Sequence, residues 1–168
     1  MKRIVILMMV VGLMLAPLAH AAGANLGIPT EKLLADLSAC LDSFSDVLPS
    51  HYPLEYTEKD AGKKSFLKLL GNHTSLSVSQ DGDMVKSFKV VSDEEKNGGS
   101  YERTCEIDAC FMSALLASNE YFTDENVMAS LSSIVYDREI MVQNGIAYRY
   151  ITGEPFTTIV ALEVTPAE

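Results

Sequence analysis

The chain has 168 residues, 23 of them acidic and 13 basic, so its formal net charge at neutral pH is −10. A surface of this charge repels phosphate backbones and anionic lipid headgroups, which argues against nucleic-acid binding and membrane-surface binding. The length suits one domain whose hydrophobic core is large enough to be stable without disulfides.

The first 21 residues contain the three parts of a secretory signal peptide in the expected order. Lys2-Arg3 form a basic start, an apolar run extends from Ile4 to Leu15, and Ala19-His20-Ala21 fits a cleavage site. The run is shorter than the roughly 20 apolar residues of a membrane span, and Pro17 interrupts it. We therefore expect cleavage after residue 21, no membrane anchor, and a periplasmic or secreted domain over residues 22–168 with a net charge of −12.

Two helices are predicted at the start of the mature domain. The first begins at Pro29-Thr30, carries apolar residues at a spacing of three and four, and ends before Pro49. The second begins at Thr57-Glu58-Lys59-Asp60, where a hydroxyl and a carboxylate three residues later can cap a helix. Its short apolar face lies within Phe66–Leu70, and Gly71-Asn72 ends it.

The period then changes to two, which indicates strands. Thr74 to Val90 reads as a hairpin with a tight turn at Asp81-Gly82, and the polar stretch Ser92–Ser100 reads as an exposed loop. Two further helices are predicted over residues 106–118 and 124–138, the latter with Thr123 as its cap.

The C-terminal part is predicted to be a meander of three strands over residues 140–143, 146–152 and 156–164. Asn144-Gly145 suits the first turn because both of its central residues need a positive φ. Gly153-Glu154-Pro155 supplies the second turn. Tyr148 and Tyr150 share one strand face with Ile146, a row that we interpret as core.

The order helix, helix, hairpin, helix, helix, three strands predicts an α+β fold. In it, helices pack on one face of an antiparallel, about five-stranded sheet. In element order alone the chain resembles the cone-shaped NTF2-like fold, whose members enclose a pocket between sheet and helices. This resemblance is one of topology, and it implies no function by itself.

Known catalytic and metal-binding patterns are absent from the sequence. His51 and His73 lie in connectors, and no Gly-x-Ser-x-Gly turn or His-Glu-x-x-His motif is present. Asp81-Gly82-Asp83 lacks the further ligands of a calcium loop and suits a hairpin turn better. We therefore predict no catalytic residue, no cofactor and no metal site.

Three cysteines, Cys40, Cys105 and Cys110, enter an oxidising compartment if the leader is cleaved, so one pair is expected to form a disulfide. We predict a bridge between Cys105 and Cys110 that leaves Cys40 buried and unreactive. The alternative is a bridge between Cys110 and Cys40.

The choice depends on where the third predicted helix begins. If Asp108 is its cap, Ile107 and Met112 form a hydrophobic staple, and the cysteine before the cap can fold back onto the one in the first turn. If Thr104 is the cap, both cysteines lie in regular helix with Cα atoms about 8 Å apart, beyond the reach of a disulfide.

These observations favour a non-catalytic envelope protein that binds another protein or a small apolar ligand. One alternative is an inhibitor or immunity protein that engages a basic target through its acidic surface. A second alternative is a small enzyme that uses an isolated buried carboxylate in a pocket between sheet and helices.

Overall fold

The structure is a computed structural model that describes residues 25–46, 48, 51–71, 73–93, 101–152 and 159–167. The predicted signal peptide, most of the predicted loop Ser92–Ser100 and the predicted turn Gly153-Glu154-Pro155 lie outside the described residues. No helix in the described ranges combines the length and the apolar character that a membrane span requires.

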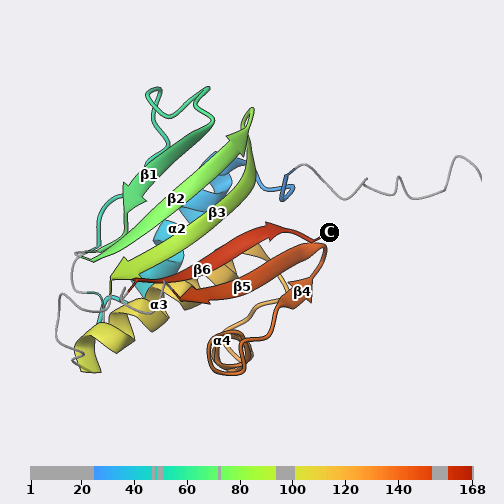
Figure 1. Ribbon diagram of the computed structural model, residues 1–168. Helices are drawn as coiled ribbons and strands as arrows, with labels where there is room; N and C mark the ends of the chain where they lie inside the picture. The colour runs from blue at the N-terminus through green and yellow to red at the C-terminus, as the bar shows by residue number, and fades with distance from the viewer. Residues whose placement is uncertain are drawn as a thin grey trace, which may run out of the picture.

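The described chain forms three helices and one open, six-stranded antiparallel sheet, so the predicted α+β class is confirmed. Figure 1 shows α2 and α3 behind the sheet, which leaves its other face toward the viewer. The strand order is β1-β2-β3-β6-β5-β4. The elements are α2 (Thr30–Ser43), β1 (Ser65–Leu69), β2 (Thr74–Asp81), β3 (Met84–Asp93), α3 (Tyr101–Ser118), α4 (Val127–Tyr136), β4 (Met141–Gln143), β5 (Ile146–Thr152) and β6 (Ile159–Pro166).

The sheet consists of two antiparallel meanders, β1-β2-β3 and β4-β5-β6, joined by the pairing of β3 with β6. The predicted hairpin is confirmed, with Asp81 opposite Met84 across a two-residue turn. The predicted C-terminal meander is confirmed as well. Asn144 and Gly145 have φ values of 51° and 77°, the conformation that their turn requires.

The core lies between the sheet and the helices. Phe88, Leu162 and Tyr148 project from three neighbouring strands and are at most 1 % exposed. Leu37 of α2 and Phe111 of α3 belong to the same core cluster and are also at most 1 % exposed. Burial of each such side chain contributes about 1.5–3 kcal/mol to stability. Tyr148 is therefore a core residue, as predicted, and its hydroxyl lies 3.2 Å from Ser118 Oγ.

The prediction of a second helix is wrong, because residues 65–69 form strand β1. Thr57 does contact Asp60, whose Oδ2 accepts hydrogen bonds from the Thr57 amide and hydroxyl. The chain then turns at Gly62, which has a φ of +74°, and does not continue as a helix. The element order behind the NTF2-like resemblance is therefore wrong at its second element.

The first helix is shorter than predicted, since α2 ends at Ser43. The cap of the fourth predicted helix is also different. Thr123 does not cap α4, which begins at Val127 after Asn126. The amide of Thr123 instead donates a hydrogen bond to Asn126 Oδ1, at 2.9 Å, within the preceding turn.

The third predicted helix begins earlier than predicted, because α3 starts at Tyr101. Asp108 is therefore an interior residue and not a cap. Both cysteines of the predicted bridge, Cys105 and Cys110, lie inside this continuous helix, and the bridge is not found. Cys40 is also unpaired, and it is half-buried, not buried as predicted.

Candidate functional site

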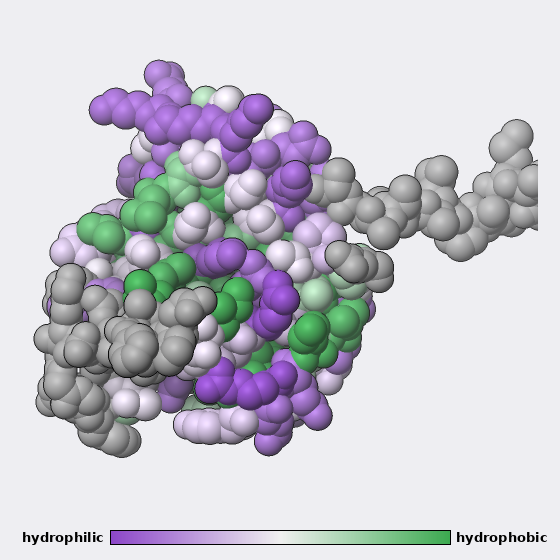
Figure 2. Space-filling view, in the orientation of Figure 1, coloured by the Kyte–Doolittle hydropathy of each residue, from purple (hydrophilic) through white to green (hydrophobic). Residues whose placement is uncertain are grey.

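The described helices α2 and α3 lie on one face of the sheet. The opposite face, which carries no helix from the described part of the chain, is the candidate functional surface, and we call it the open face. The strand registers align one residue from each of five strands across its centre. Figure 2 shows this face in the orientation of Figure 1. The central row contains Leu67, Ser77, Lys89, Glu163 and Arg149.

The centre of the open face is an ion cluster. Glu163 Oε1 lies 2.6 Å from Lys89 Nζ, and its Oε2 lies 2.5 Å from Arg149 Nη2. Glu163 is only 8 % exposed. Burial alone would raise the pKa of its carboxyl group, but hydrogen bonds from Lys89 and Arg149 outweigh burial and lower that pKa. The cluster holds one more positive than negative charge.

Apolar side chains flank this cluster. Leu67 and Leu69 of β1 are 62 % and 51 % exposed, and Ile159 of β6 is 46 % exposed. Figure 2 shows apolar and polar areas interleaved across the face. Interfaces between proteins commonly combine apolar contacts with charged groups in this way.

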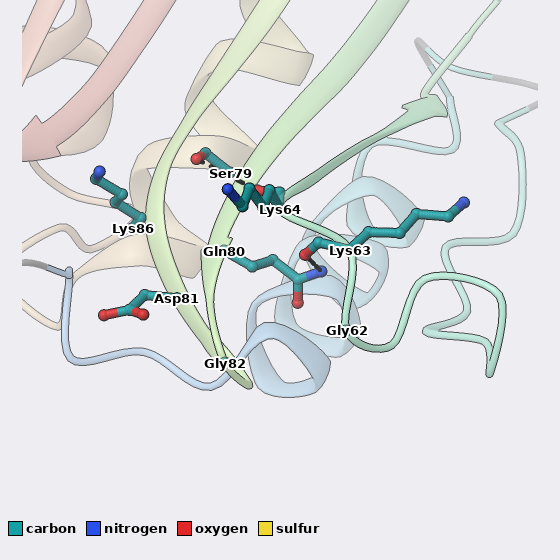
Figure 3. A pocket seen from close by; sticks show the side chains of 8 residues that line it. All are labelled: Gly62, Lys63, Lys64, Ser79, Gln80, Asp81, Gly82 and Lys86. Atoms are coloured by element: carbon teal, nitrogen blue, oxygen red, sulfur yellow. Dashed lines mark hydrogen bonds between the residues drawn. The ribbon is translucent and has the colours of Figure 1, made fainter.

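A pocket of about 530 Å³ opens at the end of the open face, beside the turn between β2 and β3. Three lysines line it, Lys63, Lys64 and Lys86, and Asp81 is its one carboxylate among the described residues. Figure 3 shows Lys86 beside β3, Lys64 near Ser79, and Lys63 extending away on the opposite side. The ammonium groups are spread around the pocket and do not converge on one point.

These three lysines differ from several others in the described chain. Lys32, Lys68 and Lys89 each form an ion pair with a carboxylate. No ion pair joins Lys63, Lys64 or Lys86 to any described residue. In a chain with an excess of acidic residues, unpaired lysines gathered at one place give that place a positive potential.

Buried Gln80 fixes the wall of the pocket. Its Oε1 accepts hydrogen bonds from Thr30 Oγ1 at 2.9 Å and from the Tyr56 hydroxyl at 3.2 Å. Its Nε2 donates to the backbone oxygen of Asp60 at 3.1 Å. It also donates to the backbone oxygen of Lys63 at 3.3 Å (Figure 3). Gln80 continues the alternation of buried residues along β2, and the irregularity beside it leaves Lys86 of β3 without a partner in β2. The loop that carries the first two lysines is thus tied to α2 and β2.

Charge is distributed unevenly between the two sides of the sheet. Lys64, Lys86, Lys89 and Arg149 lie on the open face or at its end, where Glu163 is already paired. The helical side carries many of the acids. They include Glu31, Asp36 and Asp42 of α2, and Glu120, Asp124 and Glu125 between α3 and α4.

A second pocket, of about 550 Å³, lies on the helical side near the end of α3. Its buried amide, Asn119, donates to the Gln143 carbonyl and accepts from Asn144 Nδ2 and the Tyr121 amide. Ser118, which also lines it, donates to the Leu115 carbonyl. These polar groups already have partners, so they do not require a ligand.

Among the described residues, the two histidines do not form part of a catalytic arrangement. His51 Nε2 lies 2.7 Å from Asp42 Oδ1, which ties the connector to the end of α2. His73 lies in the connector between β1 and β2. Within the described ranges, no group of three or more histidine, cysteine or acidic residues is placed to hold a metal ion.

Among the described carboxyl groups, Asp108 has a raised pKa, and burial is the cause. It lies on α3 and lines neither of the two pockets. Comparisons with protein-family models, with curated proteins and with solved structures give no match for this chain.

Proposed function

We propose that this protein is a non-catalytic, exported binding protein, and that its open face docks an acidic partner protein. The observation that supports this proposal most is the uneven charge distribution. The chain as a whole is acidic, yet Lys64, Lys86, Lys89 and Arg149 lie on the open face or at its end, beside exposed leucines. Complementary potentials steer association and select partners.

The net charge of the chain suggests a basic partner, whereas the open face suggests an acidic one. Net charge is a sum over the whole surface, but a partner contacts only a part of it. On the open face the buried acid Glu163 is neutralised by two cations. The exposed apolar contacts, Leu67 and Leu69, also lie on this face. An acidic protein surface therefore fits the open face better than a basic one.

An enzyme based on an isolated acid receives less support. Such an enzyme needs a carboxyl group of raised pKa inside a pocket that admits a substrate. Asp108 has the raised pKa but lines neither pocket. Asp81 lines the lysine pocket at an exposed position of the turn.

The test compares charge reversal on the two sides of the sheet. The tagged mature protein is used to capture partners from an envelope extract, and each captured protein is identified by mass spectrometry. The double variant Lys64→Glu with Lys86→Glu reverses charge on the open face. Lys32→Glu is the control for the other side of the sheet, because Lys32 is an exposed lysine of α2 that pairs with Asp36 on the helical side.

We expect an acidic partner whose capture falls at least tenfold with the double variant and at raised salt, and stays within about twofold with the control. Capture of a basic partner that is insensitive to the double variant would overturn the proposal. It would favour an inhibitor or immunity protein that uses the acidic side.

A further inference from the structure

The outer edge of β1 has free backbone groups in the described structure. The Leu70 amide donates a hydrogen bond to the Thr74 carbonyl. This bond determines which residues of β1 point their backbone groups toward β2. Because antiparallel strands bond through alternate residues, Phe66 and Lys68 face β2 with their backbone groups. The backbone N–H and C=O groups of the intervening residues, Ser65, Leu67 and Leu69, face away from the sheet.

The described residues provide no hydrogen bond to these outward groups. Tyr52 reaches the edge only at its end, where its amide donates to the Leu70 carbonyl at 3.3 Å. An exposed edge of this kind can pair with another chain unless a protein protects it. Here Lys68, which could have protected it, points to the helical side and pairs with Asp60.

The side chains along the edge favour an added strand as well. Leu67 and Leu69 are two residues apart, lie on the open face and are mostly exposed. A strand placed beside β1 would align its own alternate side chains with them, as cross-strand pairs do. The opposite edge of the sheet, β4, has only three residues and offers a shorter template.

We propose that β1 receives an extended acidic segment of the partner as a seventh strand of the sheet. The proposal rests on the docking function proposed above, and it names the part of the partner that makes contact. Backbone hydrogen bonds to the outward groups supply affinity, and alternate side chains supply specificity. The unpaired Lys63 and Lys64 immediately before β1 select acidic residues in the added segment.

The test uses two synthetic peptides of nine residues. One alternates valine with glutamate, and the control alternates valine with lysine. Amide hydrogen exchange of the full mature domain is followed by NMR. With the glutamate peptide we expect the amides of Leu67 and Leu69 to exchange at least tenfold more slowly, because they become hydrogen-bonded. The lysine peptide should change them less than twofold.

Two variants separate backbone pairing from side-chain contact. Leu67→Pro removes an outward amide that is not bonded to β2, so proline is tolerated there as it is on edge strands. Leu67→Thr retains the amide and is the matched control. We expect the proline variant to lose the protection of Leu69 by the glutamate peptide, and the threonine variant to keep it. The exchange result on the unaltered protein stands even if the proline variant does not fold.

Three results would overturn the proposal. The first is no slowing with the glutamate peptide, and the second is equal slowing with both peptides. The third is protection that rises with protein concentration alone, which would identify a second copy of this chain as the occupant. If an acidic partner is captured through the open face while the edge amides do not respond, docking stands and strand addition fails.

Discussion

Asp60 is a buried carboxylate whose charge should stabilise the fold. It is 6 % exposed, and its Oδ2 accepts hydrogen bonds from Lys68 Nζ at 2.7 Å, from the Thr57 hydroxyl at 2.7 Å and from the Thr57 amide at 3.1 Å. The hydrogen bond from Lys68 is the largest cause that lowers its pKa, and the hydrogen bonds from Thr57 add to it. Together they outweigh burial and bring the pKa from 3.8 to about 2.

A carboxyl group whose pKa is lower in the folded than in the unfolded state stabilises the fold above its unfolded pKa. That contribution disappears as the pH falls through the folded pKa. For Asp60 the window extends from about pH 4 down to about pH 2. The difference in pKa corresponds to about 2 kcal/mol in the free energy of unfolding at neutral pH.

The perturbation is Asp60→Asn, which keeps the shape and removes the charge. We expect the free energy of unfolding at pH 7 to fall by about 2 kcal/mol or more, because Lys68 also loses its counter-ion. Urea unfolding between pH 7 and pH 2 should show a smaller loss of stability below pH 4 in the variant. Asp46→Asn, at an exposed position, is the control. Parallel pH profiles for the unaltered protein and Asp60→Asn would refute the reasoning.

Three further predictions concern packing and the thiols. Gly71→Ala should lower the free energy of unfolding by less than about 1 kcal/mol in urea titrations, because the new Cβ would lie 2.6 Å from Glu106 Oε1, the end of a flexible side chain that can move aside; a loss of about 3 kcal/mol or more would contradict this. Cys110 should react with a thiol reagent at pH 8 more slowly than Cys105 in the folded protein and equally in denaturant, since burial raises its pKa to about 12; fast labelling when folded would contradict this. Leu162→Ala should cost about 2–5 kcal/mol by thermal or urea unfolding because the side chain is fully buried, and an unchanged midpoint would count against the described core.

The sequence was sufficient to predict the strands β2 to β6 but not β1, which lies at one edge of the sheet. In β1, Phe66 and Leu70 lie on the buried side with Lys68 between them. A lysine in the middle position conceals the period of two and leaves an apparent helical spacing. The burial of Lys68 depends on its ion pair with Asp60, which the turn at residues 58–62 brings close. The local sequence pattern does not reveal this partner.

The start of α3 was missed for a similar reason. Ile107 seemed to be a residue outside the helix that staples onto its first turn. In the structure Ile107 is 7 % exposed and begins the buried stripe that continues through Cys110, Phe111 and Ala114. The same three-four spacing is present in the sequence, but the preference of aspartate for caps favours a later start of the helix.

The candidate surface was only partly predictable. Lys89, Arg149 and Glu163 each lie between two core residues of a strand, so alternation alone places them on the outer side. That they meet in one row depends on the pairing of β3 with β6. The grouping of Lys64 and Lys86 depends on the pairing of β1 with β2 and of β2 with β3, and on the bulge at Lys86 of β3.

The pairing of β3 with β6 also bears on how the chain reaches its fold. Each meander forms from neighbouring segments, and its loops close quickly. The central pairing instead unites residues as distant in the chain as Val91 and Ala161, so α3, α4 and two further strands must be enclosed before it forms. Closing so long a loop costs conformational entropy, and local contacts do not offset that cost. We therefore expect joining the two meanders to be the slow step of folding, with the edge of β3 transiently unprotected until β6 arrives.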